Sequence, residues 1–356
     1  MRERIRILYV TDGLGNGGKE RQIIETLRNI DRRIFSPGVL TFNDNQHYTK
    51  TVSGTADYFE IIRKDTNALN PFFSIFNTYE RFKPDITHSF DIISALYSYL
   101  PSKLYGSKIV NGSIQDTGLD KGWQRKLKIF LLKLSDIAIS NSRKGLTEYG
   151  VNGEVIFNYM NISRFFPPDR GKEFNVVMVA NFTKYKDYDS FIRVMRHLIL
   201  ENLIDEAYAV GSGYNFDHYK NVINSLEPEV KNRIILTGNI YNVEELLTKM
   251  SAGFLFSTEE FSEGLSNSVQ EYMASGVIPI VSDIGASNEL IDNGVNGFLV
   301  DKYDTEGIAD IVRRLREDKQ YRDELSANCL NSIKEKFSTE KTLGRMESIY
   351  KEITHE

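Results

Sequence analysis

The stretch FSEGLSNSVQEYMASG, residues 261–276, decides the fold. It follows the run GFLFS at 253–257, whose small and apolar residues are typical of a buried strand. After that run the sequence predicts a turn at Gly264 and Leu265 and an N-cap at Ser266. A short helix over Asn267–Ala274 follows, and Gly276 ends it. A strand that leads through a tight turn into a helix is the repeating unit of α/β proteins.

The predicted start of this helix suggests a ligand. N–H groups at a helix N-terminus favour an anion such as a diphosphate. Glu263 and Glu271 stand eight residues apart around this start, so even a continuous helix would keep both on broadly one side. A sugar diphosphate needs N–H donors at phosphate, one carboxylate at the ribose and one on the sugar, and this segment can supply all three. The alternative is an amphipathic helix with two solvated glutamates.

Short β-branched or aromatic runs recur outside this stretch in two series, several of them separated by helical patterns. The first series comprises 5–10, 38–42, 58–63, 85–89, 108–111 and 136–140, and the second comprises 174–180, 206–211, 233–238, 253–257, 277–282 and 297–300. The Pro/Gly-rich segment 166–171 separates the two series. We therefore predict an α/β protein of two Rossmann-like domains, 1–168 and 169–338, facing each other across a crevice that holds the active site. Residues 339–356 keep apolar positions at helical spacing, which predicts a C-terminal helix that crosses back to the first domain.

Composition restricts the class of protein. The chain has 356 residues, enough for two cores, and its 41 % hydrophobic and 26 % charged residues are typical of a globular enzyme. A net charge of −5 argues against nucleic acid as a partner. The single cysteine, Cys329, excludes a disulfide framework. Neither a signal-peptide pattern nor an apolar run of ~18 residues is found, so we expect a cytoplasmic protein.

A glycine-rich loop, DGLGNGGKER at 12–21, follows the first predicted strand. Its glycines satisfy G-x-G-x-x-G, typical of dinucleotide sites, and G-x-x-x-x-G-K, typical of P-loops. Both are disfavoured, because no acidic residue ends the second predicted strand and Glu20 stands where a P-loop needs a hydroxyl. Two further interpretations are a turn that approaches the donor phosphates or the acceptor, and a tight turn without a ligand.

The pair Glu263-x7-Glu271, with Ser257 before it, resembles family 4 (group 1) of the retaining glycosyltransferases of GT-B fold. The similarity continues in VSDIGASNELI at 281–291 and NGFLV at 296–300, and it extends over most of the chain. GGKER at 17–21 resembles the N-terminal glycine loop of this family, 155–165 its inter-domain stretch, and 177–187 the opening of its donor domain.

The resemblance implies roles for individual residues. Glu263 would contact the donor sugar and Glu271 the nucleotide ribose. Lys186 matches the lysine of a basic pair that neutralises the pyrophosphate, whereas Asn181 stands in place of the arginine, and nearby Lys184 is the alternative source of that charge. The other predicted donor-binding residues are Gly17, Gly18, Gly264, Leu265, Ser266 and Asn267.

Two residues of the N-terminal half are candidates for catalysis. His88 lies at a strand end that resembles the family's histidine-containing strand, although the second histidine of many members is Phe90 here. Asp116 follows a strand at which the acceptor should approach. The alternatives are a hydrogen-bonded structural histidine and a loop aspartate that caps a turn.

Metal binding is disfavoured by the pattern of acidic residues. The triplet at 187–189 has the Asp-x-Asp form of metal-dependent glycosyltransferases, but it opens a predicted helix, where acids complement the helix dipole. The five histidines are scattered, so we expect no metal and no other cofactor.

Residues 121–134 predict either an ordinary domain helix or one in peripheral contact with a membrane, because cations surround an apolar face. That face comprises Trp123, Leu127, Leu131 and Leu134.

Together these features predict a retaining glycosyltransferase that moves a hexosyl or N-acetylhexosaminyl group from a nucleotide diphosphate sugar, expected to be UDP-linked. The expected acceptor is a glycan or lipid-linked glycan in surface polysaccharide synthesis. The alternatives are a GT-B-like nucleotide-sugar epimerase, which needs no acceptor, a phosphorylase, a non-catalytic sugar-nucleotide sensor, and a Rossmann-type nucleotide-binding protein such as an oxidoreductase.

Overall fold

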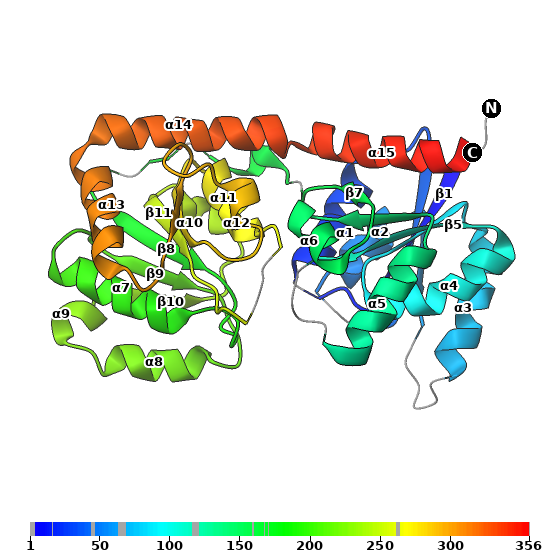
Figure 1. The fold of residues 1–356 in the computed structure, drawn as a ribbon, viewed down its shortest axis with the longest axis horizontal. Helices are drawn as coiled ribbons and strands as arrows, with labels where there is room; N and C mark the ends of the chain where they lie inside the picture. The colour runs from blue at the N-terminus through cyan, green and yellow to red at the C-terminus, as the bar shows by residue number, and fades with distance from the viewer. Residues whose placement is uncertain are drawn as a thin grey trace. The chain divides into compact units, whose positions relative to one another are not determined.

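The computed structural model describes residues 4–15, 17–43, 47–62, 69–115, 121–158, 160–166, 168–169, 171–260 and 264–355. The chain forms two compact units, each with its own parallel sheet (Figure 1). Unit 1 comprises Met1–Asn161 and Phe337–Glu356, and unit 2 comprises Ile162–Lys336.

Unit 1 contains, within the described residues, a seven-stranded sheet of order β3-β2-β1-β4-β5-β6-β7, in which neighbouring strands run parallel. Its strands are β1 (Ile5–Thr11), β2 (Phe35–Thr41), β3 (Tyr58–Ile61), β4 (Ile86–Ser89), β5 (Lys108–Ile114), β6 (Ile137–Ser140) and β7 (Glu154–Val155). Its helices are α1 (Gly18–Asn29), α2 (Thr49–Thr55), α3 (Leu69–Phe82), α4 (Ile92–Tyr105), α5 (Gly122–Leu134), α6 (Arg143–Tyr149) and α15 (Thr339–His355). The strand order reverses between β1 and β4, so their carboxyl ends frame the usual ligand position of such a sheet.

Unit 2 contains, in its described part, a six-stranded parallel sheet of order β10-β9-β8-β11-β12-β13, with the reversal between β8 and β11. Its strands are β8 (Asn175–Val179), β9 (Ala207–Val210), β10 (Ile234–Gly238), β11 (Met250–Leu255), β12 (Ile278–Ser282) and β13 (Phe298–Val300). Its helices are η1 (Ile162–Arg164), α7 (Tyr188–Leu200), α8 (Phe216–Asn224), α9 (Pro228–Lys231), α10 (Val243–Leu247), α11 (Asn267–Ala274), α12 (Ser287–Leu290), α13 (Thr305–Glu317) and α14 (Lys319–Lys336).

Two parallel sheets with helices confirm the predicted α/β class. Every predicted strand has an observed counterpart within a few residues, because strands buried on both faces read as continuous apolar runs. The strand that the prediction missed is β7, whose two residues are too few to show a pattern.

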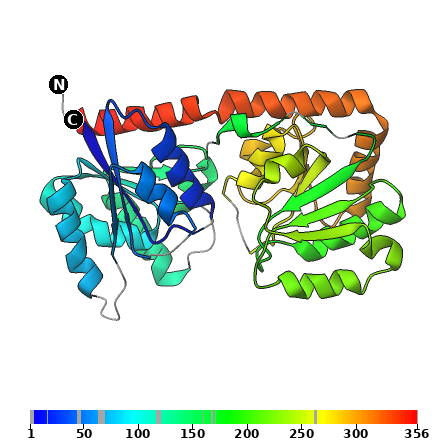
Figure 2. The same ribbon diagram turned by 180° about the vertical axis from the view of Figure 1, so that it is seen from behind.

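The last helix of the chain, α15, packs on the sheet of unit 1, and Figure 2 shows it in red beside the blue strands. Its apolar positions recur every three or four residues and join a cluster with side chains of β1, β2 and α1. The α15 members of this cluster are Leu343, Met346, Ile349 and Tyr350. Residues far apart in sequence therefore share one core.

The first boundary between the units differs from the prediction. It falls after Asn161 rather than after residue 168. The reason is local packing: Phe165 lies against the unit 2 cluster that contains Val177, and Arg164 forms an ion pair with Glu244 at 3.0 Å. The Pro/Gly-rich segment is therefore already part of unit 2, and composition alone places the boundary too late.

Candidate functional site

In unit 2, α11 begins beyond the carboxyl end of β11, where the strand order reverses. Ser266 stands at the N-cap position, as predicted, but its side chain accepts no hydrogen bond from the first turn. The N–H dipoles at the start of a helix favour an anion, so this end of α11 is suited to a phosphate.

Glu271 lies just over one turn into α11 and is 5 % exposed. The helix is fixed by Tyr272, whose hydroxyl accepts from the Val179 N–H at 2.6 Å and donates to the Phe254 carbonyl at 3.1 Å. Gly253 makes room for this ring, since a Cβ there would lie 2.4 Å from it. These contacts tie α11 to both β8 and β11, so Glu271 stands on a rigid support.

The loop after β8 carries Lys186, which is half-buried and forms an isolated antiparallel bridge with Ser257. Beside it the buried ammonium of Lys302 lies 2.7 Å from Asp187 Oδ2 and 2.9 Å from the Ser257 carbonyl. Burial by itself raises the pKa of Asp187, but hydrogen bonds from Lys302 and Ser190 outweigh burial and hold that pKa below its usual range. Lys302 therefore anchors the Lys186 loop, and its charge is committed to Asp187.

Asn181, which stands where the resemblance predicts the arginine of a basic pair, is exposed. Its carbonyl accepts from the Thr183 N–H at 2.8 Å. Lys184 is exposed on the same loop, with its ammonium 5.1 Å from the centre of the Tyr185 ring. A second cation therefore stands within reach of the loop that carries Lys186.

Sequence reasoning missed Lys302, Gly211 and Gly213. The two glycines follow β9 with φ of +145° and +155°, and Cβ atoms there would lie 2.1 and 2.4 Å from the carbonyl oxygens of Ala180 and Phe182. They let this loop lie against the loop after β8, and their G-x-G spacing after a predicted strand is the signal that could have identified them. Lys302 carries no comparable signal, since only the fold brings it to its partner.

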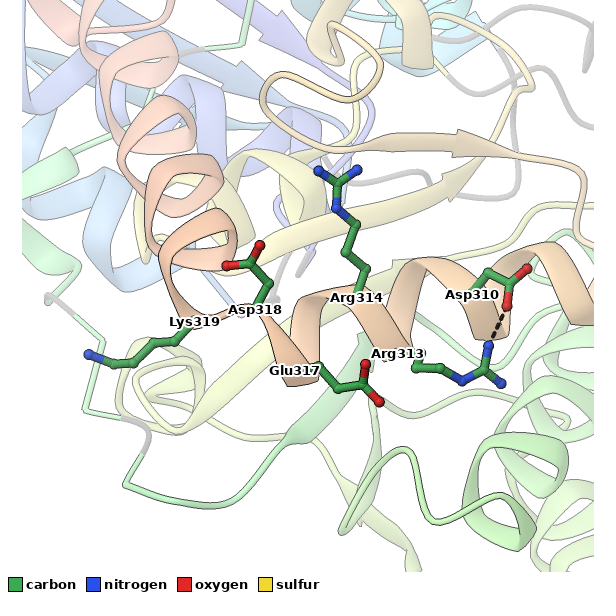
Figure 3. A pocket seen from close by; sticks show the side chains of 6 residues that line it. All are labelled: Asp310, Arg313, Arg314, Glu317, Asp318 and Lys319. Atoms are coloured by element: carbon green, nitrogen blue, oxygen red, sulfur yellow. Dashed lines mark hydrogen bonds and ion pairs between the residues drawn. The ribbon is translucent and has the colours of Figure 1, made fainter.

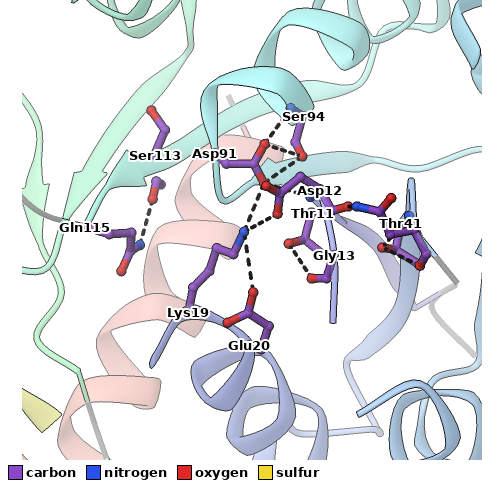
Figure 4. Close-up of polar contacts among 12 residues, drawn as sticks. Thr11, Asp12, Gly13, Lys19, Glu20, Thr41, Asp91, Ser94, Ser113 and Gln115 are labelled. Atoms are coloured by element: carbon purple, nitrogen blue, oxygen red, sulfur yellow. Dashed lines mark hydrogen bonds and ion pairs between the residues drawn. The ribbon is translucent and has the colours of Figure 1, made fainter. Parts of the chain in front are cut away.

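In unit 1 the glycine loop between β1 and α1 is organised around Lys19 (Figure 4). Its ammonium contacts three carboxylates, those of Asp12, of Asp91 at 3.4 Å and of Glu20 at 3.6 Å. Burial by itself lowers the pKa of Lys19, but the three carboxylates outweigh burial and raise it. Asp91 also caps α4, accepting from the Ser94 N–H at 2.8 Å. Lys19 thus ties the ends of β1 and β4 together and is not placed as a P-loop lysine.

Gly17 is the N-cap of α1 and Gly18 is its first residue. A Cβ on Gly17 would lie 2.4 Å from a carboxylate oxygen of Glu20, which folds back over the helix start. That carboxylate would have to move before a phosphate could approach Gly17, because the two anions repel each other.

His88 is a buried residue of β4 with a titratable side chain. Its Nδ1 lies 2.7 Å from the Tyr350 hydroxyl on α15, and Phe90 stacks on the imidazole with ring centres 4.4 Å apart. Burial lowers the pKa of His88 to about 3, so the ring is neutral at physiological pH.

The other ring nitrogen of His88 faces a small cavity. Within the described residues Nε2 has no hydrogen-bond partner, and neither has Asn141 Oδ1, whose residue lines the same cavity of about 30 Å³. That is room for about one water molecule or hydroxyl group. Gly112 keeps the space open, because a Cβ there would lie 2.6 Å from Nε2.

The structure gathers the described candidates into one group in each unit. At the carboxyl ends of β8 and β11 lie Asn181, Lys186, Gly264, Leu265, Ser266, Asn267 and Glu271. At the carboxyl ends of β1 and β4 lie Gly17, Gly18 and His88. Glu263 and Asp116 lie outside the described residues.

A separate hollow lies on the outer surface at the end of α13 and is lined by charged side chains (Figure 3). Arg313 pairs there with Asp310, and the guanidinium of Arg314 lies over the Tyr321 ring at 3.7 Å. A helix that follows a parallel strand ends near the amino ends of the sheet, so this hollow is remote from the carboxyl ends.

Among the described residues no three His, Cys, Asp or Glu side chains come together as a metal site. Asp187 is held by Lys302, and Asp189 accepts a hydrogen bond from the Tyr219 hydroxyl at 3.2 Å. Of the described helices, none has the length and apolarity needed to cross a membrane.

Comparison with known proteins identifies the class of protein that this fold and site define. Residues 160–331 match the model of the family "Glycosyl transferases group 1". This segment is similar to that family, and the protein is a glycosyltransferase with a GT-B fold.

The individual proteins that resemble this chain share low sequence identity with it. The chain is 26 % identical over 293 residues to N-acetyl-alpha-D-glucosaminyl L-malate synthase of Bacillus anthracis, covering 76 % of this chain and 75 % of that protein. It is 21 % identical to the UDP-Gal:alpha-D-GlcNAc-diphosphoundecaprenol alpha-1,3-galactosyltransferase of Escherichia coli, over 78 % of each chain. The structure of Anabaena Alr3699/HepE in complex with UDP superposes with a TM-score of 0.86 at 17 % identity, covering 98 % of this chain and 100 % of that one.

Proposed function

We propose that this protein is a retaining glycosyltransferase that moves a hexosyl or N-acetylhexosaminyl group from a UDP-linked sugar to a glycan or lipid-linked glycan. The observation that carries the proposal is the position of the α11 N-terminus beyond β11, with Glu271 buried behind it and Lys186 on the neighbouring loop. The Anabaena neighbour crystallised with UDP, and the Escherichia coli relative is named for a UDP-galactose donor and a lipid-diphosphate acceptor. The first name agrees with a UDP-linked donor, and the second agrees with a UDP-linked donor and a lipid-linked acceptor.

The proposed roles follow from where charge develops. When the glycosidic bond to the diphosphate breaks, negative charge grows on the leaving phosphate and the sugar becomes oxocarbenium-like. The N–H dipoles at Ser266 and Asn267 and the ammonium of Lys186 would stabilise that phosphate, with Lys184 in place of the absent arginine. Glu271 would accept hydrogen bonds from the ribose hydroxyls, and Glu263 would contact the donor sugar.

Neutral His88 would act as a hydrogen-bonding group and not as an acid or base. Its low pKa keeps it unprotonated, and Nε2 faces a cavity of hydroxyl size. Asp116 remains the proposed carboxylate on the acceptor side. We further propose that the reaction needs no metal, because Asp187 and Asp189 are already engaged by Lys302 and Tyr219.

A thermal-shift screen of UDP, GDP, ADP, NAD and Mg-ATP, each with and without EDTA, tests the proposed donor. We expect stabilisation by UDP that survives EDTA, since ligand at 100 times Kd adds about 2.7 kcal/mol of stability. Incubation with UDP-sugars should then yield UDP only when an acceptor is supplied. Stabilisation by NAD or Mg-ATP alone, or loss of the UDP response in EDTA, would contradict the proposal.

We also propose that unit 1 contacts a membrane surface, through a face that differs from the sequence prediction. Leu131 is 4 % exposed and therefore belongs to the core of the unit. The apolar side chains that α5 exposes are Trp123 and Phe130, at 71 % and 58 %, and they share one helix face with the exposed Lys126 and Lys133.

The neighbouring helix α4 extends this face, which we call the α4–α5 face. Its exposed residues on α4 are Leu96, Leu100, Lys103 and Leu104. Neither helix contains an Asp or Glu, so the charged side chains that the two helices themselves add to this face are cations; of these, Lys103 pairs with Asp136 at 3.8 Å. This chemistry complements a bilayer that contains anionic lipids, into which aromatic and leucine side chains insert while lysines contact headgroups.

A further inference from the structure

The hydrogen bond between His88 and Tyr350 joins residues 262 positions apart. His88 belongs to β4, whereas Tyr350 belongs to α15, which the chain reaches only after completing unit 2. Both side chains are buried, at 1 % and 0 % exposure. The bond is therefore a feature of tertiary packing, and it fixes one nitrogen of an imidazole whose other nitrogen faces the cavity.

For a substrate hydroxyl bound in the cavity, the two polar atoms determine where the histidine proton must be. The amide of Asn141 is oriented by its Nδ2, which donates to the Gln115 carbonyl at 3.0 Å, so Oδ1 is the atom left facing the cavity as an acceptor. A hydroxyl group has one proton to donate. It can satisfy Asn141 Oδ1 and His88 Nε2 together only if Nε2 carries a proton, because two acceptors would compete for the same hydrogen.

Tyr350 can donate the hydrogen bond that Nδ1 of His88 needs in this tautomer. A neutral imidazole with its proton on Nε2 has a bare Nδ1, which needs a donor when it is buried. The phenolic hydroxyl of Tyr350 is such a donor at hydrogen-bond distance. We propose that Tyr350 is a positioning residue: its hydroxyl donates to His88 Nδ1, holds the ring and keeps the proton on Nε2, which then donates to a substrate hydroxyl in the cavity.

The role in catalysis rests on the proposed glycosyltransferase function, whereas the hydrogen-bond direction does not. Selective 15N-histidine labelling of the full chain, with His88→Gln to assign the signal, reports the tautomer without substrate. We expect a pyridine-type Nδ1 and a pyrrole-type Nε2 for His88. In Tyr350→Phe the Nδ1 resonance should move, because it loses its donor.

Kinetics test the positioning role. Tyr350→Phe should lower kcat about tenfold, which corresponds to ~1.4 kcal/mol, and change the KM for the donor sugar less than twofold. In a His88→Gln background the same substitution should cause no further loss, because its effect passes through the imidazole. Tyr79→Phe is the matched control, since it removes an equally buried hydroxyl that bonds Thr87 and Ser102 but not His88.

Two spectroscopic results would overturn the inference: a pyrrole-type Nδ1 in the unaltered protein, or an unmoved Nδ1 resonance in Tyr350→Phe. A kinetic result would overturn it as well, namely a double variant whose loss in kcat equals the product of the losses in His88→Gln and Tyr350→Phe. Failure to transfer sugar from any donor would instead defeat the proposed function while the 15N result stood.

Discussion

At the residue scale, His88 shows how burial turns a titratable group into a fixed neutral one. The pKa of His88 is about 3 in the folded protein and about 6.5 in an unfolded chain. Between these two pH values the unfolded state therefore binds a proton on this ring that the folded state does not bind. The stability that depends on neutral His88 is complete above pH 6.5 and is lost as pH falls toward 3.

We therefore predict that the unfolding free energy of unit 1 falls by up to ~1.4 kcal/mol per pH unit between pH 6.5 and 4.5. His88→Gln should flatten this slope, as measured by urea unfolding at a series of pH values. His218→Gln, at an exposed position on α8, is the control and should leave the slope intact. An equally steep slope in His88→Gln would mean that another buried group is responsible.

Glu271 and Glu263 are predicted to act at different stages. Glu271→Gln should weaken UDP binding about tenfold to a hundredfold, because a charged acceptor is lost at the ribose. Glu263→Gln should bind UDP normally and fail to transfer sugar. Titration calorimetry with UDP, alongside activity, distinguishes the two. Glu317→Gln, an exposed glutamate of the same unit, should change neither, and equal loss of binding in both site variants would refute the division of roles.

At the element scale, the start of α7 depends on Asp187, which caps the helix through the Ser190 N–H at 2.9 Å and holds Lys302. Lys302→Met should destabilise unit 2 by about 3–5 kcal/mol, because it leaves a buried carboxylate without its cation. UDP affinity should fall as well, since the Lys186 loop loses its anchor.

Chemical unfolding and UDP titration measure these two effects of Lys302→Met. Lys319→Met provides the contrast, because the Lys319–Asp323 pair at 3.5 Å is exposed and worth ~1 kcal/mol at most. Similar losses in the two variants would show that burial of the Asp187–Lys302 pair is unimportant.

The α4–α5 face can be followed by fluorescence, because Trp123 is the single tryptophan of the chain. Vesicles containing phosphatidylglycerol should shift its emission to the blue, whereas neutral vesicles should not, since Lys126 and Lys133 need anionic headgroups. Phe130→Ser with Leu100→Ser should weaken binding in a sedimentation assay. Tyr303→Ser, at an exposed aromatic of unit 2, should not, and an unshifted Trp123 on anionic vesicles would contradict the proposal.

At the scale of the whole molecule, consecutive helices α14 and α15 serve different cores, those of unit 2 and unit 1. Ile333 and Ile349 are both 0 % exposed. Ile349→Ala should lower the stability of unit 1, and Ile333→Ala that of unit 2, each by about 2–5 kcal/mol. In calorimetric scans the two variants should lower the temperatures of different unfolding transitions. UDP should raise the temperature of the transition that Ile333→Ala lowers. Identical effects would mean that the units unfold as one.

Sequence reasoning succeeded where a signal is local and failed where it is not. The buried strands and the start of α11 are visible because burial and helix initiation impose patterns over a few residues. The outward face of α5 was misassigned, because helical spacing groups Trp123 with Leu131 without showing which side the neighbouring elements cover. The unit boundary was placed late, because Phe165 reveals its partners only in the fold.

The sequence by itself therefore determined the α/β class, the two sheets, the helix start at Ser266 and the family resemblance, since these depend on neighbours along the chain. The tertiary structure decided that Lys302 neutralises Asp187, that Lys19 is held by carboxylates, and that Tyr350 reaches His88. The physical reason is that such pairs are selected by burial and charge at positions tens to hundreds of residues apart, and no pattern along the chain encodes which of many lysines or tyrosines folding will bring to a given site.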